Sequence, residues 1–490
     1  MGDSVLKRKT IVSLFWSFLD KFGEQLIYLV SGIILLRIVE PTEYGLMGTL
    51  MIFTVFSKVI ADSGFGRALL NKKDISETAY SSVFYFNVGI SLFFYIALFF
   101  LAPFIAKVFN EPRLTAVSRI LFLSFVFYSF GIIQQTLLVK RADFRTITKV
   151  NIPSLLIAAT VAIVMGIKGM GVWCLVAQHL IYSFLRTLFM WIKTGWKPVA
   201  QFSLHALRSF FIFSNKLLAS GLITAIFNNI YPAIIAYFYP NSMNQVGYYS
   251  QANKYQDIPF GMISNAFRSV SMLILSEINK ELERLKRVVR KIMQSVAFLA
   301  FPIGLYMILA AEPAFQILFG NKWNPAIPYF KGLTIAGMLS PFIFILNELF
   351  IARERADFFL GVEIAKRTIL VALIVLLFKY GIMGLVASWV IYTFITLLIS
   401  LILAKKLIRY SILHFIKDVF PYLTIAVFIN GIGYIVTQQI ANNFLFMITT
   451  SAIVFGGYWL ICKGLKLEMS REIEAWFAQK RNRKTPKNSS

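Results

Sequence analysis

Long apolar segments follow one another along the whole chain, separated by short polar connections. An α-helix needs about 20 mostly apolar residues to cross the hydrocarbon of a bilayer, and by this rule the chain contains about fourteen spans. They lie near residues 11–36, 44–69, 80–108, 115–139, 150–168, 171–193, 208–239, 245–275, 291–319, 325–351, 359–378, 382–404, 415–437 and 440–462. The pattern therefore predicts an all-α integral membrane protein.

The composition supports this interpretation. The 490 residues are 58% hydrophobic, with a mean hydropathy of +0.70, and only 15% are charged. A soluble domain has roughly 25% charged residues. The two cysteines, Cys174 and Cys462, lie far apart in apolar segments, which argues against a disulfide framework or a thiolate metal site. We expect no metal centre.

The net charge of +26 raises the question of a nucleic-acid partner, and the positions of the charges exclude it. Most of the 49 Lys and Arg residues lie in short connections on the side of the membrane that holds the N-terminus. This bias predicts an even number of spans with both termini in the cytoplasm. We expect residues 464–490 to form a basic cytoplasmic tail near anionic lipid, so membrane lipids are the expected partners.

An internal repeat relates the two halves of the chain. The matched segments are VKRADF (139–144) with RERADF (353–358), GVWCLVAQHLIYSF (171–184) with GIMGLVASWVIYTF (381–394), VEPTEYG (39–45) with YPNSMNQVG (239–247), and GFGRALL (64–70) with AFRSVSM (266–272). Spans one to six therefore repeat as spans seven to twelve.

Because six is even, both halves enter the membrane from the same side, which makes this a parallel repeat about an axis along the membrane normal. We predict an N-lobe at 1–205, a C-lobe at 206–410 and two additional spans at 411–463. Parallel repeats of this kind commonly place a substrate site between two helical bundles.

Several spans carry ionisable residues, although a charge at mid-bilayer costs about 2.5 to 3.5 kcal/mol on insertion scales. Such residues usually face a bundle interior or a water-filled cavity. The basic residues within spans are Lys21, Lys58, Arg186, Lys254 and Arg268, and Arg67 lies at the end of the second span. The acidic residues that accompany them are Asp20, Glu24, Asp62 and Asp257. We expect a polar cavity, lined chiefly by spans one, two and eight.

Two interpretations of these charges remain open. Lys58 with Asp62, and Lys21 with Glu24, are spaced to form structural ion pairs on one helix face. Alternatively, the basic residues bind a phosphate or diphosphate, which Arg holds in a forked geometry. The carboxylates would then bind H⁺ or Na⁺ as a coupling ion, or balance the charge of the cavity.

The motifs of catalysis are missing from the sequence. There is no G-x-x-x-x-G-K-[ST] motif for ATP, and the three histidines, His179, His205 and His414, are isolated in different segments. No connection is long enough to supply the acid and base of a membrane enzyme. We expect a transporter without catalytic residues or an organic cofactor.

The sequence resembles the polysaccharide and oligosaccharide flippases of the multidrug/oligosaccharidyl-lipid/polysaccharide superfamily, especially the lipopolysaccharide-biosynthesis exporters. The resemblance covers essentially the whole chain. It is most specific in LLRIVEPTEYGLMG (35–48), DSGFGRALLNKKD (62–74), YSSVFYFNVGISL (80–92), QQTLLVKRADF (134–144) and GYYSQANKYQDIPF (247–260).

The resemblance implies a two-lobed transporter in the bacterial inner membrane. It would carry an undecaprenyl-diphosphate-linked oligosaccharide to the periplasmic leaflet by alternating access. In related flippases spans one, two, seven and eight line the cavity and basic residues receive the diphosphate. By span and residue type, the corresponding candidates are Lys21, Lys58, Arg67, Lys216, Lys254 and Arg268. Asp20, Glu24, Asp62 and Asp257 are the candidates for cation coupling or charge balance.

Two rival functions remain. A cation-coupled multidrug exporter of the same superfamily would need a cavity with net negative charge. A membrane polysaccharide polymerase or ligase would act on lipid-linked sugar in detergent, where there are no leaflets to cross. The two additional C-terminal spans favour the flippase branch, and we expect a monomer because a two-lobed transporter completes its own cavity.

Overall fold

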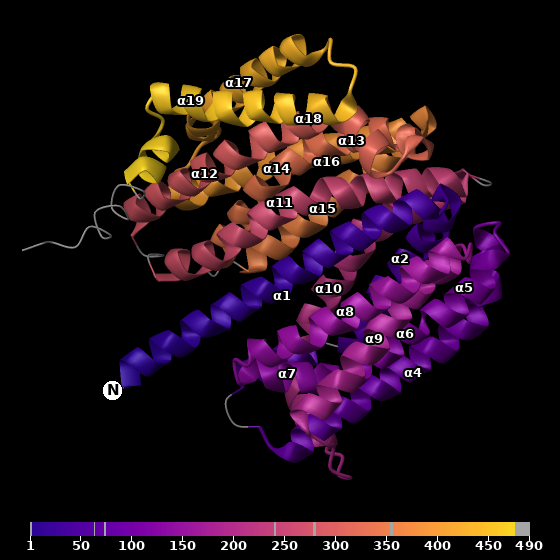
Figure 1. Cartoon of the computed structure of the whole chain (residues 1–490). Helices are drawn as coiled ribbons and strands as arrows, with labels where there is room; N and C mark the ends of the chain where they lie inside the picture. Colours follow the sequence, from indigo (N-terminus) through magenta and orange to yellow (C-terminus); the bar gives the residue numbers. More distant parts are fainter. Residues whose placement is uncertain are drawn as a thin grey trace, which may run out of the picture. The chain divides into compact units, whose positions relative to one another are not determined.

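The structure is a computed structural model, and it describes residues 2–62, 64–72, 75–239, 242–277, 281–352 and 356–475. Within these ranges all regular secondary structure is helical (Figure 1). The chain divides into two compact units, residues 1–250 and 251–490, and the division falls inside one long helix. The predicted lobe boundaries at 205/206, 410/411 and 463/464 stay predictions, and residues 476–490 of the predicted tail lie outside the described residues.

Unit 1 contains ten helices and the first turns of an eleventh within its described residues. Their bounds are α1 Gly2–Ile38, α2 Pro41–Asp62, α3 Phe65–Asn71, α4 Glu77–Val108, α5 Arg113–Leu121, α6 Leu123–Phe130, α7 Ile132–Lys140, α8 Phe144–Ile167, α9 Val172–Thr194, α10 Leu204–Phe238 and α11 Met243–Glu277. Side chains at the N-caps begin several of them. Ser76, Asp143 and Ser203 each accept a hydrogen bond from the backbone N–H three residues later, which satisfies a donor that has no partner within the helix.

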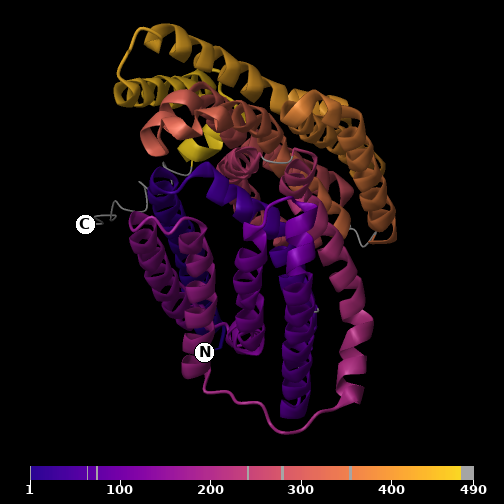
Figure 2. The same ribbon diagram turned by 90° about the vertical axis from the view of Figure 1, so that its right-hand side faces the viewer.

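The connection between α9 and α10 is extended (Figure 2). Gly195, with a φ of 62°, ends α9 in the left-handed conformation that glycine adopts readily. The connection is then held against the start of α4, because the N–H groups of Val199 and Ser203 donate to the hydroxyls of Ser81 and Ser82. These bonds fix the position of α10 relative to α4 within unit 1.

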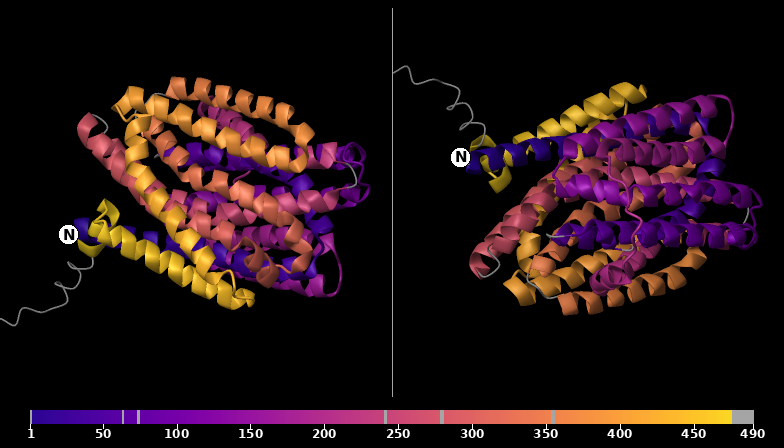
Figure 3. Two further views of the ribbon diagram at one scale, coloured as in Figure 1. Left: turned by 90° about the horizontal axis from the view of Figure 1, so that it is seen from above. Right: turned by 90° about the horizontal axis from the view of Figure 1, so that it is seen from below.

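Unit 2 continues α11 and adds the remaining helices. Their bounds are α12 Leu282–Leu309, α13 Ala311–Leu318, η1 Asn321–Ala326, α14 Ile327–Ala352, α15 Ala356–Leu377, η2 Phe378–Tyr380, α16 Gly381–Ile408, α17 Ile412–Thr437, α18 Asn443–Ser451, the π-helical segment η3 Ala452–Gly456 and α19 Gly457–Gly464. The last helices form a hairpin with α17 (Figure 3), in which Thr450 donates a 2.9 Å hydrogen bond to Thr437. A buried carboxylate, Asp418, joins α17 to α12 because Arg290 donates to both of its oxygens.

The protein is an integral membrane protein. Among the described residues, eleven helical stretches are long and apolar enough to cross a bilayer, and the longest, Gly361–Ile408, contains most of α15 and all of α16. Large apolar side chains also face outward. On α4, Phe93, Phe100 and Phe104 share one helix face and are each more than 60% exposed, as expected for a surface that contacts lipid. The predicted number of fourteen spans stays a prediction.

Within unit 1 the first turns of α2 and α11 cross at backbone contact distance. A Cβ atom added at Gly45 would lie 1.8 Å from the carbonyl oxygen of Met243, and one added at Gly247 would lie 2.0 Å from that of Pro41. The two glycines end the matched segments 39–45 and 239–247 of the predicted repeat. Each therefore contacts the first turn of the other's helix, and neither position has space for a side chain.

Replacing Gly45 with Ala should destabilise the protein by about 1–3 kcal/mol, because the added methyl group forces the two backbones apart. The measurement is thermal unfolding of the purified protein in detergent. Gly89→Ala is the matched control, because Gly89 also lies in a long helix and a Cβ atom there meets nothing within 4 Å. Equal unfolding temperatures for the two variants would contradict the close crossing.

Candidate functional site

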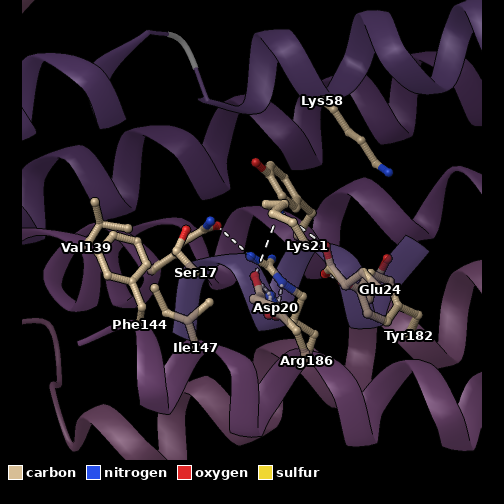
Figure 4. Close-up of a pocket in the computed structure, with 14 residues that line it drawn as sticks. Ser17, Asp20, Lys21, Glu24, Lys58, Val139, Phe144, Ile147, Tyr182 and Arg186 are labelled. Atoms are coloured by element: carbon tan, nitrogen blue, oxygen red, sulfur yellow. Dashed lines mark hydrogen bonds and ion pairs between the residues drawn. The ribbon is translucent and has the colours of Figure 1, made fainter. Parts of the chain in front are cut away.

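A polar cavity of about 290 Å³ lies within unit 1 (Figure 4). Side chains of α1, α2, α6, α7, α8 and α9 line it. The lining residues are Ser17, Asp20, Lys21, Glu24, Lys58, Tyr128, Gln135, Val139, Phe144, Ile147, Asn151, Tyr182, Ser183 and Arg186. Four of the ten residues predicted for the site, Asp20, Lys21, Glu24 and Lys58, are thus brought to one cavity.

The charges of α1 form a small network at the edge of the cavity. The Lys21 Nζ is 3.2 Å from Glu24 Oε2 and 3.9 Å from Asp20 Oδ2. Tyr182 on α9 donates a 2.9 Å hydrogen bond to the other oxygen of Glu24. Lys21 is exposed whereas Asp20 is buried, so the lysine approaches the two carboxylates from the solvent-exposed side of the cavity. The i,i+3 pair of Lys21 with Glu24 is therefore present, and it also faces the cavity.

A single neutral amide, that of Asn151, joins the buried carboxylate of Asp20 to the buried guanidinium of Arg186. The Asn151 amide nitrogen on α8 lies 3.2 and 3.3 Å from the two Asp20 oxygens, and its oxygen accepts from Arg186 Nε at 3.0 Å. Arg186 on α9 also donates through Nη2 to Gln135 Oε1 on α7 at 2.6 Å. The four side chains lie on four helices, so this network helps to fix how α1, α7, α8 and α9 pack together.

Two basic groups of the cavity have no carboxylate partner among the described residues. Lys58 on α2 has its Nζ 6.0 Å from the centroid of the Tyr128 ring, and the Arg186 guanidinium carbon is 5.8 Å from the same centroid. No hydrogen bond or ion pair reaches Lys58 from the residues drawn in Figure 4. A cation near an aromatic ring gains about 0.5 to 2 kcal/mol, which does not replace the solvation of a full charge.

The cavity consequently has an excess of positive charge. Three basic residues and two carboxylates line it, which leaves a net charge of +1 when all five are ionised. Arg186 and Lys58 supply hydrogen-bond donors, and Arg186 retains N–H groups beyond the two that contact Asn151 and Gln135. Such an arrangement is chemically suited to an anion with several oxygen acceptors, such as a phosphate.

The other predicted site residues lie elsewhere or outside the described side chains. Asp62 is half-buried on α2 and is not part of the cavity lining. In unit 2, Lys254 and Asp257 are exposed on α11, whereas the Arg268 Nε lies 3.3 Å from Glu348 Oε1. The side chains of Arg67 and Lys216 lie outside the described part of the structure. The binding roles of all ten residues stay predictions.

Arg186, Asn151, Gln135 and Tyr128 were not among the predicted site residues. Arg186 satisfies the criterion that selected Lys58, because it is a charge in the middle of an apolar helix. The resemblance assigns the cavity to spans one, two, seven and eight, whereas Arg186 lies in the sixth predicted span. Asn151 gives no comparable signal, since an amide in a span is usually an ordinary hydrogen-bonding partner between helices.

Unit 2 contains a second group of charges, and these are paired with one another. Lys366 on α15 is 1% exposed, and its Nζ lies 3.2 Å from Glu363 Oε1 and 3.5 Å from Asn347 Oδ1. Arg367 lies 3.6 Å from the other oxygen of Glu363. This group stabilises the packing of α14 against α15, and both of its cations contact a carboxylate. The cavity of unit 1 differs from it, because Lys58 and Arg186 contact none of the described carboxylates.

The chain is similar to proteins that work in the synthesis and transport of polysaccharides. It is 27% identical over 328 residues to the succinoglycan biosynthesis transport protein ExoT of Rhizobium meliloti, with 66% of each chain covered. It is 23% identical to the lipopolysaccharide biosynthesis protein WzxC of Escherichia coli, over 76% of this chain and 75% of that one. These names describe transport and biosynthesis in general, and they point to a transporter more than to an enzyme.

The fold is that of a solved flippase structure. The lipid II flippase MurJ, in an inward closed conformation, matches with a TM-score of 0.75 at 14% identity, over 92% of this chain and 99% of that chain. Residues 34–328 match a family described as polysaccharide biosynthesis protein. Because this match covers more than half of the chain, the protein belongs to the polysaccharide biosynthesis protein family.

Proposed function

We propose that the protein is a flippase that moves an undecaprenyl-diphosphate-linked oligosaccharide across the bacterial inner membrane by alternating access. The observation that carries the proposal is the presence in one cavity of unit 1 of two cations, Lys58 and Arg186, that have no carboxylate partner among the described residues. The family and the transport relative ExoT support a polysaccharide substrate, and the MurJ-like fold is compatible with a lipid-linked one. Both termini would lie in the cytoplasm, and the protein would act as a monomer.

In this mechanism the diphosphate enters the cavity and takes the place of water around Lys58 and Arg186. Arg186 presents a planar fork of N–H groups to the phosphate oxygens, and Lys58 adds a compact charge from the neighbouring helix. Lys21 is exposed at the edge and would meet the anion first. The prenyl chain remains in lipid, because burying a long hydrocarbon in a polar cavity has no compensating interaction.

In the proposed mechanism the carboxylates couple the binding of the anionic substrate to the binding of a cation. A proton or Na⁺ bound at Asp20 or Glu24 makes the cavity more positive and so favours the anionic substrate. By thermodynamic reciprocity, the bound substrate then favours the cation to the same extent. Loss of the bound cation would lower the affinity for the diphosphate and allow the substrate to leave.

The multidrug-exporter alternative is less compatible with the charge of this cavity. An exporter of amphipathic cations needs an excess of carboxylates, whereas the lining has three basic and two acidic residues. An anionic substrate is favoured by Coulomb energy in the same place where a cation is repelled.

Neutralising either of these two cations should slow transport. We expect Arg186→Gln and Lys58→Gln each to lower the flipping rate of a lipid-linked oligosaccharide at least tenfold, the effect of losing about 1.4 kcal/mol of interaction with phosphate. The rate is measured in proteoliposomes by the accessibility of the sugar to an added hydrolase. Lys193→Gln is the control, because Lys193 is exposed in the last turn of α9 and does not line the cavity. Wild-type rates in both cavity variants would refute the site.

Replacing Asp20 with Asn should uncouple transport from the ion gradient, because the amide cannot take up a proton or bind Na⁺ as a carboxylate does. The measurement is the flipping rate in proteoliposomes with and without an imposed pH or Na⁺ gradient. Wild-type protein and the control Glu312→Gln, an exposed acidic residue of α13, should respond to the gradient. An equal response from Asp20→Asn would assign coupling to another residue.

A further inference from the structure

We propose that Asn151 is a positioning residue that keeps Asp20 and Arg186 apart, so that the guanidinium of Arg186 remains available to the anionic part of the substrate. This inference rests on the proposed function, because it concerns the same cavity. It assigns a role to a neutral residue that lies on a helix outside the predicted cavity-lining spans.

The geometry of the amide carries the argument. Asp20, Asn151 and Arg186 are 4%, 3% and 8% exposed, so the two charges and the amide between them are all buried. The Asn151 Nδ2 donates to both carboxylate oxygens while its Oδ1 accepts from Arg186 Nε. An amide has a donor group and an acceptor group at opposite corners, so it satisfies a carboxylate and a guanidinium at the same time. The two ions make no direct ion pair in the described structure.

The second contact of Arg186 is also to a neutral oxygen. Its Nη2 donates to Gln135 Oε1 at 2.6 Å, so both of these partners of the guanidinium are amide oxygens. Amide oxygens orient the group without cancelling its charge. A guanidinium has five N–H donors, and those that remain can receive phosphate oxygens at the cavity wall.

Removing the amide would change the charges that the substrate meets. Without the amide, the carboxylate and the guanidinium would each lose a buried hydrogen-bond partner, and a direct bond between them would recover part of that lost free energy. Asp20 and Arg186 would then form a closed pair, and the cavity would offer the anion only Lys58 and the exposed Lys21. The loss of affinity would come from Asp20, a residue that the anion does not contact.

Because the loss of affinity would come from Asp20, a second substitution at Asp20 should reverse it, and this reversal tests the inference. The probe is farnesyl diphosphate, a short prenyl diphosphate, titrated calorimetrically into the purified full-length protein in detergent. Asn151→Ala should bind it about tenfold more weakly than wild type, the usual size of one lost charge-assisted phosphate contact. Adding Asp20→Asn should restore the affinity to that of Asp20→Asn alone, because Arg186 then has no carboxylate to pair with.

Glu24→Gln is the matched control for this rescue. It removes a carboxylate from the same cavity, but Glu24 is held by Lys21 and Tyr182 and does not contact Asn151. A gain of affinity from lower negative charge alone would therefore appear equally with Glu24→Gln and with Asp20→Asn. The positioning role requires that only Asp20→Asn suppresses the effect of Asn151→Ala.

A second variant covers the case in which Asn151→Ala does not fold. Asn151→Leu has nearly the same volume but can neither donate nor accept a hydrogen bond, so it should also weaken binding. In this background Asp20→Asn should again restore affinity, because Arg186 then has no carboxylate to pair with. Wild-type affinity in Asn151→Leu, or rescue of Asn151→Ala by Glu24→Gln as readily as by Asp20→Asn, would overturn the inference.

The outcomes also separate this inference from the proposed function. If wild-type protein does not bind farnesyl diphosphate, the proposed diphosphate site itself fails. If wild type binds and Arg186→Gln weakens the binding while Asn151→Ala does not, the diphosphate site stands and the role of Asn151 is refuted.

Discussion

The free-energy cost of placing a charge inside a membrane-spanning helix determines how charged side chains are arranged in the interior of this protein. A cation there needs a partner to replace the water that it has lost. Three cations of unit 2 have such partners in the chain itself, since Lys366 and Arg367 bind Glu363 and Arg268 binds Glu348. In unit 1 the described residues supply no carboxylate to Lys58 or Arg186. In the proposed function, the diphosphate of the substrate supplies the negative charge that these two cations lack.

The fold could be predicted largely from the lengths of the apolar segments. The segment predicted at 115–139 corresponds to α5, α6 and α7, which together run from Arg113 to Lys140 as one stretch long enough to span the membrane. The breaks at Phe122 and Gly131 were not predicted. Hydropathy averaged over a span reports its length, whereas a break depends on local backbone angles and on the helices packed beside it.

The candidate site was predicted as far as charge alone could indicate it. Asp20, Lys21, Glu24 and Lys58 are conspicuous because charges are rare in spans, and the structure places them around one cavity. The neutral residues that hydrogen-bond to Asp20, Arg186 and Glu24 are Asn151, Gln135 and Tyr182, which in a sequence look like ordinary polar residues between helices. Their importance depends on which helices are neighbours, and that information is present only in three dimensions.

The crossing of α2 and α11 has a consequence for the history of the chain. Gly45 contacts Met243 and Gly247 contacts Pro41, so the two contacts are the same contact made twice with the roles exchanged. Under the predicted duplication, a half-length ancestor that paired with its own copy would have met both requirements with a single glycine codon. Fusion of the two copies would have made those codons independent. A substitution at either glycine would then have disrupted only one of the two contacts. The chain still has glycine at both positions.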